Sequence, residues 1–149
     1  MSVTETIVVG VDGSEGAAAA LEYAAGEAAF RRAPLRIVSA WQVPVTPYRA
    51  DLVPLLDQTT VDAFHTRAQQ VADDALALVK ELQPSLEVEA TAVQGHAADV
   101  LLDQGGDASQ IVVGRRGLGG FRSLLLGSVS HQVVQHATCP VVVVNQPAS

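Results

Sequence analysis

The sequence has little cysteine and few aromatic residues, and each shortage excludes a class of protein. Its single cysteine, Cys139, rules out an intramolecular disulfide framework and zinc sites built from several cysteines. Only 4% of the 149 residues are aromatic, which is too few for a surface that stacks the bases of single-stranded nucleic acid. The net charge of -7 also argues against general nucleic-acid binding.

Long apolar runs are missing as well. No run approaches the roughly 20 apolar residues that span a bilayer. The first 16 residues lack a basic start and carry Glu5 before a short apolar run, unlike a signal peptide. We therefore expect a cytoplasmic protein without a membrane partner. Since 48% of the residues are hydrophobic, we expect residues 1–149 to form one domain with one core.

Positive charge is scarce but locally concentrated. The first 107 residues contain six basic and sixteen acidic side chains, whereas the last 42 contain three basic and no acidic ones. The three are Arg115, Arg116 and Arg122, which lie within a glycine-rich stretch. An acidic protein with one locally basic loop is suited to a small anion rather than a polyanion.

The order of apolar runs predicts the fold class. Val-rich or β-branched runs predict strands at 6–11, 33–41, 87–93, 109–114 and 139–145, and helical spacing predicts helices at 15–32, 59–83, 96–105 and 128–136. This alternation predicts an α/β protein with an open five-stranded parallel sheet and helices on both faces. Residues 42–58 contain three prolines and are predicted to be a long irregular connection.

The apolar positions of two helices predict which side faces the sheet. In the first helix these are Ala18, Leu21, Ala25 and Ala28. In the long helix they are Phe64, Ala68, Val71, Ala75, Leu78 and Leu82.

The loops after the first and fourth predicted strands have the composition of a ligand site. They read "GVDGS" and "GRRGLGG", and ligands of open α/β sheets bind outside the carboxyl ends of the strands. The second loop runs from Gly114 through Gly117 and, after nine intervening residues, reaches Gly127-Ser128 at the start of a helix. Glycines allow main-chain N–H groups to approach an anion, and a helix N-terminus attracts phosphate. The stretch is therefore predicted to bind phosphates, and Ser128 could donate its hydroxyl. A role as N-cap is the alternative for Ser128, and it is compatible with phosphate binding by the neighbouring residues.

Other catalytic and phosphate motifs are absent from the sequence. The only lysine, Lys80, lies in the long helix, so no Walker motif exists, and neither glycine loop has the Gly-x-Gly-x-x-Gly spacing. No serine lies in a Gly-x-Ser-x-Gly elbow, and the four histidines show no metal-ligand spacing.

The spacing Gly-x2-Gly-x9-Gly-Ser at 114–128 resembles the nucleotide signature of the universal stress proteins, in their ATP-binding branch. "VVGVDGS", "GHAADVLL" and "GSVSHQVVQHATCPVVVV" resemble further segments of that family, so the resemblance covers nearly the whole chain apart from 42–58. It implies an adenine nucleotide alpha hydrolase-like fold with strand order 3-2-1-4-5. It also implies ATP between the first and fourth strands and a homodimer through the last strand, at residues 141–145.

The loop chemistry and the resemblance together define the candidate cofactor-binding residues. They are Gly10, Asp12, Val38, Ala40, Gly114, Arg115, Arg116, Gly117, Gly119, Gly120, Gly127, Ser128 and Val129. Asp12 is also the candidate ligand for Mg²⁺, which prefers carboxylate and phosphate oxygens. Arg115 and Arg116 are adjacent, so their side chains diverge and at most one is expected to reach the phosphates.

The resemblance implies an ATP-binding, nucleotide-responsive regulator of stress survival or growth, with protein partners that the sequence does not identify. Two alternatives stay open at this point: a slow ATPase using the same site, and an interaction scaffold with structural nucleotide or none. No residue in the sequence is identifiable as a general base at a γ-phosphate, which argues against efficient phosphoryl transfer.

Overall fold

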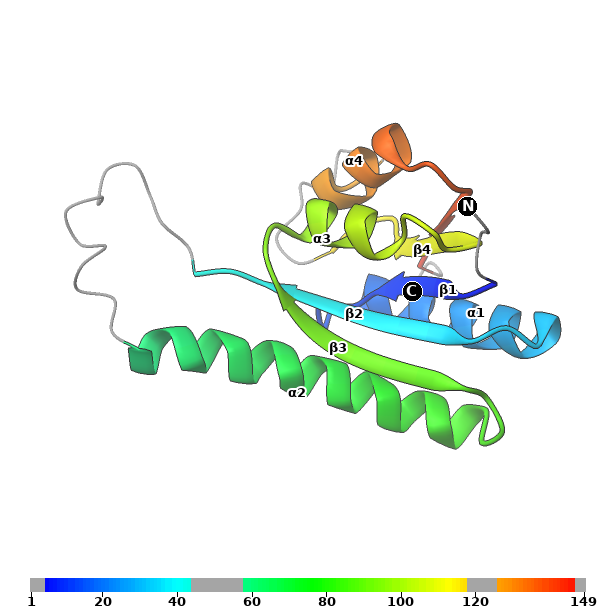
Figure 1. Ribbon diagram of the computed structural model, residues 1–149, viewed down its shortest axis with the longest axis horizontal. Coiled ribbons are helices and arrows are strands. Elements are labelled where there is room, and N and C mark those ends of the chain that lie inside the picture. Colours follow the sequence, from blue (N-terminus) through cyan, green and yellow to red (C-terminus); the bar gives the residue numbers. More distant parts are fainter. Residues whose placement is uncertain (1–4, 44–57, 118–125, 147–149) are drawn as a thin grey trace.

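Strands and helices alternate along the chain, as the apolar pattern predicts (Figure 1). The computed structural model describes residues 5–43, 58–117 and 126–146. Their elements are β1 (Ile7–Gly10), α1 (Glu15–Arg31), β2 (Leu35–Trp41), α2 (Gln58–Leu82), β3 (Val88–Gln94), α3 (Ala97–Gln104), β4 (Gln110–Gly114), α4 (Ser128–His136) and β5 (Val141–Val144). Every predicted element is present, with ends that differ by at most two residues.

The five strands are parallel and lie in the order β3-β2-β1-β4-β5, which confirms the expected topology. β1 lies between β2 and β4, so the chain extends the sheet in one direction before it returns and extends it in the other. The strand order therefore reverses between β1 and β4. This is the position at which open α/β sheets bind ligands.

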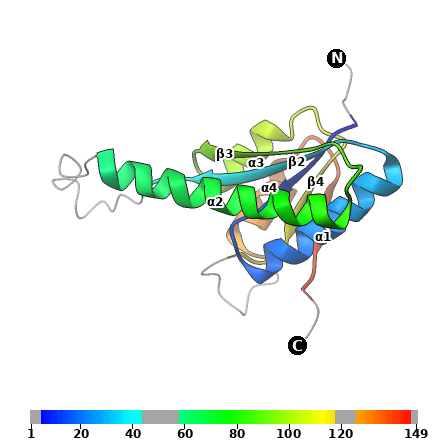
Figure 2. The same ribbon diagram turned by 90° about the horizontal axis from the view of Figure 1, so that it is seen from below.

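Helices cover both faces of the sheet. α1 and α2 pack on one face, and α3 and α4 pack on the other (Figure 1). Figure 2 shows α1 and α2 in front of the sheet, with α2 reaching well beyond the ends of the strands. None of the helices in the described part of the chain is both long and apolar enough to cross a membrane.

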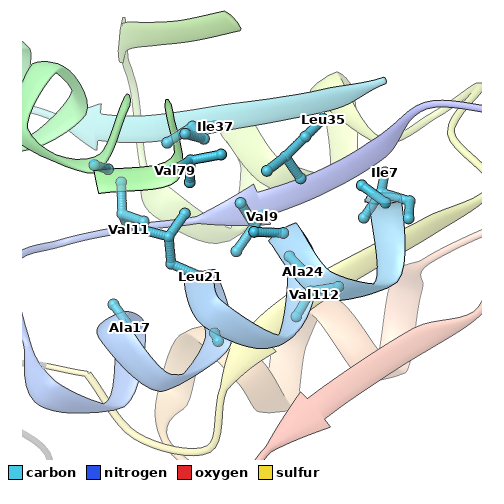
Figure 3. Packing of buried hydrophobic residues seen from close by; sticks show 14 of the residues in the cluster. Ile7, Val9, Val11, Ala17, Leu21, Ala24, Leu35, Ile37, Val79 and Val112 are labelled. Carbon is cyan, nitrogen blue, oxygen red and sulfur yellow. The ribbon is translucent and has the colours of Figure 1, made fainter. Parts of the chain in front are cut away.

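The central strand β1 is apolar on both sides because it separates two cores. Ile7 and Val9 belong to the core on the α1 side of the sheet, and Figure 3 shows Val9 near Leu21 and Ala24 of that helix. Val8 points to the opposite core, which α3 and α4 complete. All three β1 side chains are fully buried, which explains the unbroken apolar run in the sequence.

The helix α1 approaches the sheet through alanines. Its N-cap Ser14 accepts a hydrogen bond from the Ala17 N–H at 3.1 Å, and the helix ends at Arg32 in the left-handed conformation. Ala17 is buried, whereas Ala18, which was predicted to face the sheet, is exposed. The prediction for Ala18 was wrong because alanines lie on the buried and the exposed sides of this helix alike, so the pattern has little contrast to orient it.

The predicted sheet-facing side of the long helix α2 is confirmed only in part. Its buried residues are Ala68, Ala72, Ala75 and Val79. The predicted core residues Leu78 and Leu82 are instead 37% and 47% exposed. Small side chains let α2 lie close to β2 and β3, and the larger leucines flank the contact instead of filling it.

Candidate functional site

A cavity opens at the carboxyl ends of β1 and β4, where the strand order reverses. Its walls come from the turn after β1, the end of β2, the first turns of α1, α3 and α4, and the segment after β4. The lining residues are Gly10, Val11, Asp12, Ser14, Ala17, Val38, Ala40, Ala97, Leu101, Val113, Gly114, Arg116, Gly117, Gly127, Ser128, Val129 and Ser130.

Two glycines bring the end of β4 directly against the first turn of α1. A Cβ atom on Gly114 would lie 2.6 Å from the carbonyl oxygen of Gly16, and a Cβ atom on Gly16 would meet the carbonyl oxygen of Arg116. Both obstacles are backbone atoms, so a larger residue would force the two segments apart. Main chain from β4 and main chain from α1 therefore form one side of the cavity together.

The turn after β1 is fixed by the carboxylate of Asp12. Its Oδ1 atom accepts a hydrogen bond from the Ser14 N–H at 2.9 Å. Its Oδ2 atom would lie 2.5 Å from a Cβ atom on Gly117, so the absence of a side chain there leaves room for the carboxylate. Asp12 and Gly117 thus come from the two predicted ligand loops and lie next to each other across the cavity.

A pair of hydrogen bonds closes the segment between β4 and α4 at its base. The carbonyl oxygen of Arg115 accepts from the Gly127 N–H at 2.7 Å and from the Ser130 hydroxyl at 2.8 Å. The Arg115 N–H in turn donates to the carbonyl of Val144 at 3.0 Å, which extends the β4–β5 ladder by one bond. Since Ser130 is buried, these bonds set the start of α4 firmly against the end of β4.

The N-terminus of α4 points into the cavity. Gly127 occupies the cap position in an extended conformation, with φ −69° and ψ 168°, and offers no side chain to the helix. The helical hydrogen bonds begin at His131, whose N–H donates to the Gly127 carbonyl at 2.9 Å. The N–H groups of the first turn have no partner within a helix, and they add to the positive end of its dipole. Ser128 is the first helical residue, so the alternative that it caps this helix is wrong.

The opposite end of the cavity is apolar. Val38 and Ala40 of β2 face Leu101 of α3 there. Gly10 lets that leucine approach the sheet, because a Cβ atom on Gly10 would lie 2.9 Å from Leu101 Cδ1.

The backbone of Ala40 adds a polar edge to this apolar end. The Val38 carbonyl accepts from the Val11 N–H on the β1 side at 2.9 Å, and the Trp41 carbonyl accepts from the Gly95 N–H on the β3 side at 2.8 Å. Because successive residues of a strand present their polar groups to alternate sides, Ala40 presents its N–H and C=O toward β1. β1 has ended at that level, so both groups border the cavity.

The structure brings together most of the residues that the sequence indicated. Those lining the cavity are Gly10, Asp12, Val38, Ala40, Gly114, Arg116, Gly117, Gly127, Ser128 and Val129. Arg115 is half-buried and does not line it, so Arg116 is the member of the pair that borders the cavity. Gly119 and Gly120 lie outside the described residues, as does Arg122.

Sequence reasoning missed several lining residues, among them Ala97, Leu101 and Ser130. Ala97 and Leu101 reach the site because α3 packs across β1 and β2, which no local pattern specifies. Ser130 had a weak signal, since it is a serine one turn into a helix that starts at the glycine motif. Its buried hydroxyl shows why a polar residue is present at that position.

Metal-binding and thiol chemistry have little support in this part of the chain. The described residues contain no group of three or more His, Cys, Asp or Glu side chains that could hold a metal ion. The only cysteine, Cys139, is half-buried and near the Gly105 carbonyl, 3.6 Å from its Sγ atom. Burial raises the pKa of the Cys139 thiol above its ordinary value, which disfavours the reactive thiolate.

The sheet order and the position of the cavity define an α/β protein of the adenine nucleotide alpha hydrolase-like class. Within that class the chain belongs to the universal stress protein family, whose sequence model matches residues 4–145.

Individual relatives agree with this assignment. Universal stress protein Rv2624c of Mycobacterium tuberculosis is 34% identical over 149 residues, which covers 97% of this chain and 51% of its own. A universal stress protein of Thermus aquaticus is 36% identical over 142 residues, covering 94% of this chain and 98% of its own. The chain spans about half the length of the mycobacterial relatives that it matches.

A solved structure is similar in fold as well as sequence. The crystal structure of a universal stress protein in complex with cAMP superposes with a TM-score of 0.69 at 26% identity, over 98% of this chain and 100% of that one.

Proposed function

We propose that the protein binds ATP in the cavity between β1 and β4 and acts as a nucleotide-responsive regulator. The observation that carries the proposal is the glycine-lined start of α4. There, N–H groups without helical partners face a cavity that also contains Gly117 and Arg116. Such a group of backbone donors at the positive end of a helix dipole is suited to phosphate oxygens.

The apolar end of the same cavity is suited to an adenine ring. Val38, Ala40 and Leu101 provide apolar contacts to its faces. The backbone of Ala40 offers one donor and one acceptor side by side, which match N1 and the exocyclic amine of adenine. A bound ATP would therefore extend from β2, across the end of β1, to α4.

The arrangement is compatible with a magnesium ion if Asp12 is its protein ligand. Asp12 is the carboxylate at the site, and its Oδ2 atom borders Gly117 on the proposed phosphate side. Mg²⁺ typically keeps several waters and is bound through one or two carboxylates together with phosphates. We infer that Asp12 would hold the ion only when a nucleotide is bound.

Related structures and the edge of the sheet support the remaining parts of the proposal. A related universal stress protein was crystallised with cAMP, another adenine nucleotide. β5 pairs only with β4 among the described strands, so its outer edge is available to a second copy through residues 141–145. We propose a homodimer through this strand, in which nucleotide binding shifts a conformational equilibrium by its differential affinity for the two states.

Calorimetric titration of nucleotide-free protein with ATP and Mg²⁺ tests the proposal. The parent should bind ATP saturably, and Gly117→Ala should lose binding because its methyl group would displace the Asp12 carboxylate. Gly106→Ala is the matched control, since a Cβ atom there makes only an ordinary contact, 3.5 Å from the Asp103 carbonyl oxygen. If the parent binds no adenine nucleotide, or if Gly117→Ala binds it as well as the parent does, the site is wrongly assigned.

A further inference from the structure

The side of α1 that faces away from the sheet carries an apolar stripe. Its members are Ala19, Tyr23, Gly26 and Phe30, separated by four, three and four residues, so they lie along one side of the helix. Phe30 is 86% exposed and Tyr23 is 40% exposed, although aromatic side chains are scarce in this chain. Apart from Gly16, the buried residues of α1 lie on the opposite side, and they are Ala17, Ala20, Leu21, Ala24, Ala25 and Ala28.

Gly26 has no explanation within a single copy of the chain. It lies in the middle of α1 with a negative φ, and a Cβ atom on it would have no neighbour within 4 Å. Glycine in a helix interior is destabilising relative to alanine. Neither backbone conformation nor internal packing therefore requires glycine at this position, whereas a neighbouring molecule that approaches the helix closely would.

We propose that α1 packs antiparallel against α1 of a second copy of this chain. If the two-fold axis passes between residues 24 and 25, Tyr23 of each copy lies opposite Gly26 of the other, and Phe30 lies opposite Ala19. Each aromatic ring then meets a small residue. The same surface patch thus complements itself, as a two-fold symmetric interface requires.

Charge along the helix favours the antiparallel orientation. α1 begins with Glu15 and ends beside Arg31 and Arg32. In the proposed pair, Arg32 of one copy comes level with residue 17 of the other, within one turn of Glu15. The two helix dipoles also run in opposite directions, so each positive N-terminus lies near a negative C-terminus.

This interface is separate from the edge of β5. The stripe lies on the outer surface of a helix that covers one face of the sheet, whereas β5 ends the sheet laterally (Figures 1 and 2). It therefore does not depend on nucleotide binding or on the proposed dimer through β5. If both contacts form, one copy has two different partners, and the assembly is larger than a dimer.

Sedimentation velocity over a range of protein concentrations tests the contact. Phe30→Glu should weaken one association step by at least about tenfold, because it places a charge in a contact that depends on a buried aromatic ring. Leu82→Glu is the matched control, since Leu82 is an exposed apolar residue of α2 outside the stripe and its substitution should not change assembly. A parent that sediments like Phe30→Glu at every concentration overturns the proposal.

Gly26→Ala separates the interface from the stability of the fold. In an isolated chain this substitution should raise Tm by about 2 to 4 °C, because alanine favours the helix. In the proposed pair its methyl group occupies the space of the opposing Tyr23, so association should weaken although the fold is more stable. Unchanged association in Gly26→Ala would overturn the packing that we propose.

Disulfide trapping in a Cys139→Ala background determines the orientation. A mixture of Ala19→Cys and Phe30→Cys proteins should form a mixed disulfide, because these positions oppose each other in the antiparallel pair. Phe30→Cys alone should not form one, since its two copies would be displaced by about 16 Å along the helices. Cross-linking of Phe30→Cys with itself would show a parallel pair and refute the proposed arrangement.

Discussion

Ser130 of α4 donates its hydroxyl to the carbonyl oxygen of Arg115, 2.8 Å away at the end of β4. The same oxygen accepts the Gly127 N–H, so side chain and main chain hold the two elements together. The phosphate site that we propose lies at this junction. Ser130 is thus expected to position the backbone donors of α4 without contacting the nucleotide itself.

Replacing Ser130 with alanine should weaken both the fold and the site. Loss of this hydrogen bond should lower the free energy of unfolding by about 1 kcal/mol and raise the dissociation constant of ATP several-fold. Ser109→Ala is a matched control, because its hydroxyl donates to the Glu5 carbonyl at 3.0 Å, away from the cavity. The Ser109→Ala protein should lose similar stability and keep its ATP affinity. Urea denaturation and calorimetry on both variants measure the two effects. An ATP affinity of Ser130→Ala equal to that of the parent would refute the positioning role.

Gly114 should stabilise the fold as well as shape the ligand site. Gly114→Ala places a methyl group 2.6 Å from the Gly16 carbonyl oxygen, and the overlap should cost about 1–3 kcal/mol of unfolding free energy. Gly106→Ala should change the unfolding free energy little. Parallel urea titrations compare the parent with the two variants, and a Gly114→Ala protein as stable as the parent would contradict the close backbone contact.

The backbone edge at Ala40 should select adenine over guanine. Guanine presents an acceptor oxygen and a ring N–H where adenine presents a donor amine and an acceptor nitrogen, so both hydrogen bonds would be mismatched. ATP should therefore bind at least about tenfold more tightly than GTP. Competition titrations measure the ratio, and similar affinities for the two nucleotides would argue against the proposed adenine position.

Cys139 should react slowly with thiol reagents. Because burial raises its pKa, the thiolate fraction near neutral pH is smaller than for an exposed cysteine. Because the pKa of the Cys139 thiol is raised in the folded state, the protonated thiol favours folding fully at low pH. This contribution to stability is lost as pH rises through the alkaline range. Cys139→Ala should therefore reduce the alkaline loss of stability. Thiol titration of native and urea-unfolded protein measures the reactivity, and equal rates would contradict the burial.

The single tryptophan should report on how α2 packs against the sheet. Trp41 at the end of β2 stacks on His65 of α2, with ring centroids 5.0 Å apart and planes inclined by 12°. His65→Ala should lower the free energy of unfolding by about 0.5–1 kcal/mol and move the Trp41 emission to longer wavelength as water reaches the ring. Thr66→Ala, at an exposed neighbouring position, is the control. An unchanged emission spectrum in His65→Ala would show that the stack does not persist in solution.

The sequence predicts the order of elements well because each strand and helix has its own local pattern. It also predicts the glycine loops, since Gly114 lies close to the backbone of Gly16 and Gly117 lies close to the carboxylate of Asp12, and a larger residue would disturb either contact. Orientation of the helices is harder to predict. In α1, alanines lie on the buried and the exposed sides alike, and the buried residues of α2 include Ala72 and Val79 instead of the predicted leucines.

The part of the site that the sequence did not predict comes from tertiary packing. Leu101 reaches the cavity only because Gly10 leaves space above β1 for α3. The donor and acceptor of Ala40 face the cavity only because β1 is shorter than β2. Neither relation is encoded near these residues in the chain, so local patterns could not show them.

The hydrogen bond between Arg115 and Gly127 has a consequence for divergence within the family. Because the two ends of the segment are joined directly, the number of residues between them can change without moving β4 or α4. Relatives can therefore differ in the number of residues between Arg115 and Gly127 and still hold the start of α4 at the cavity.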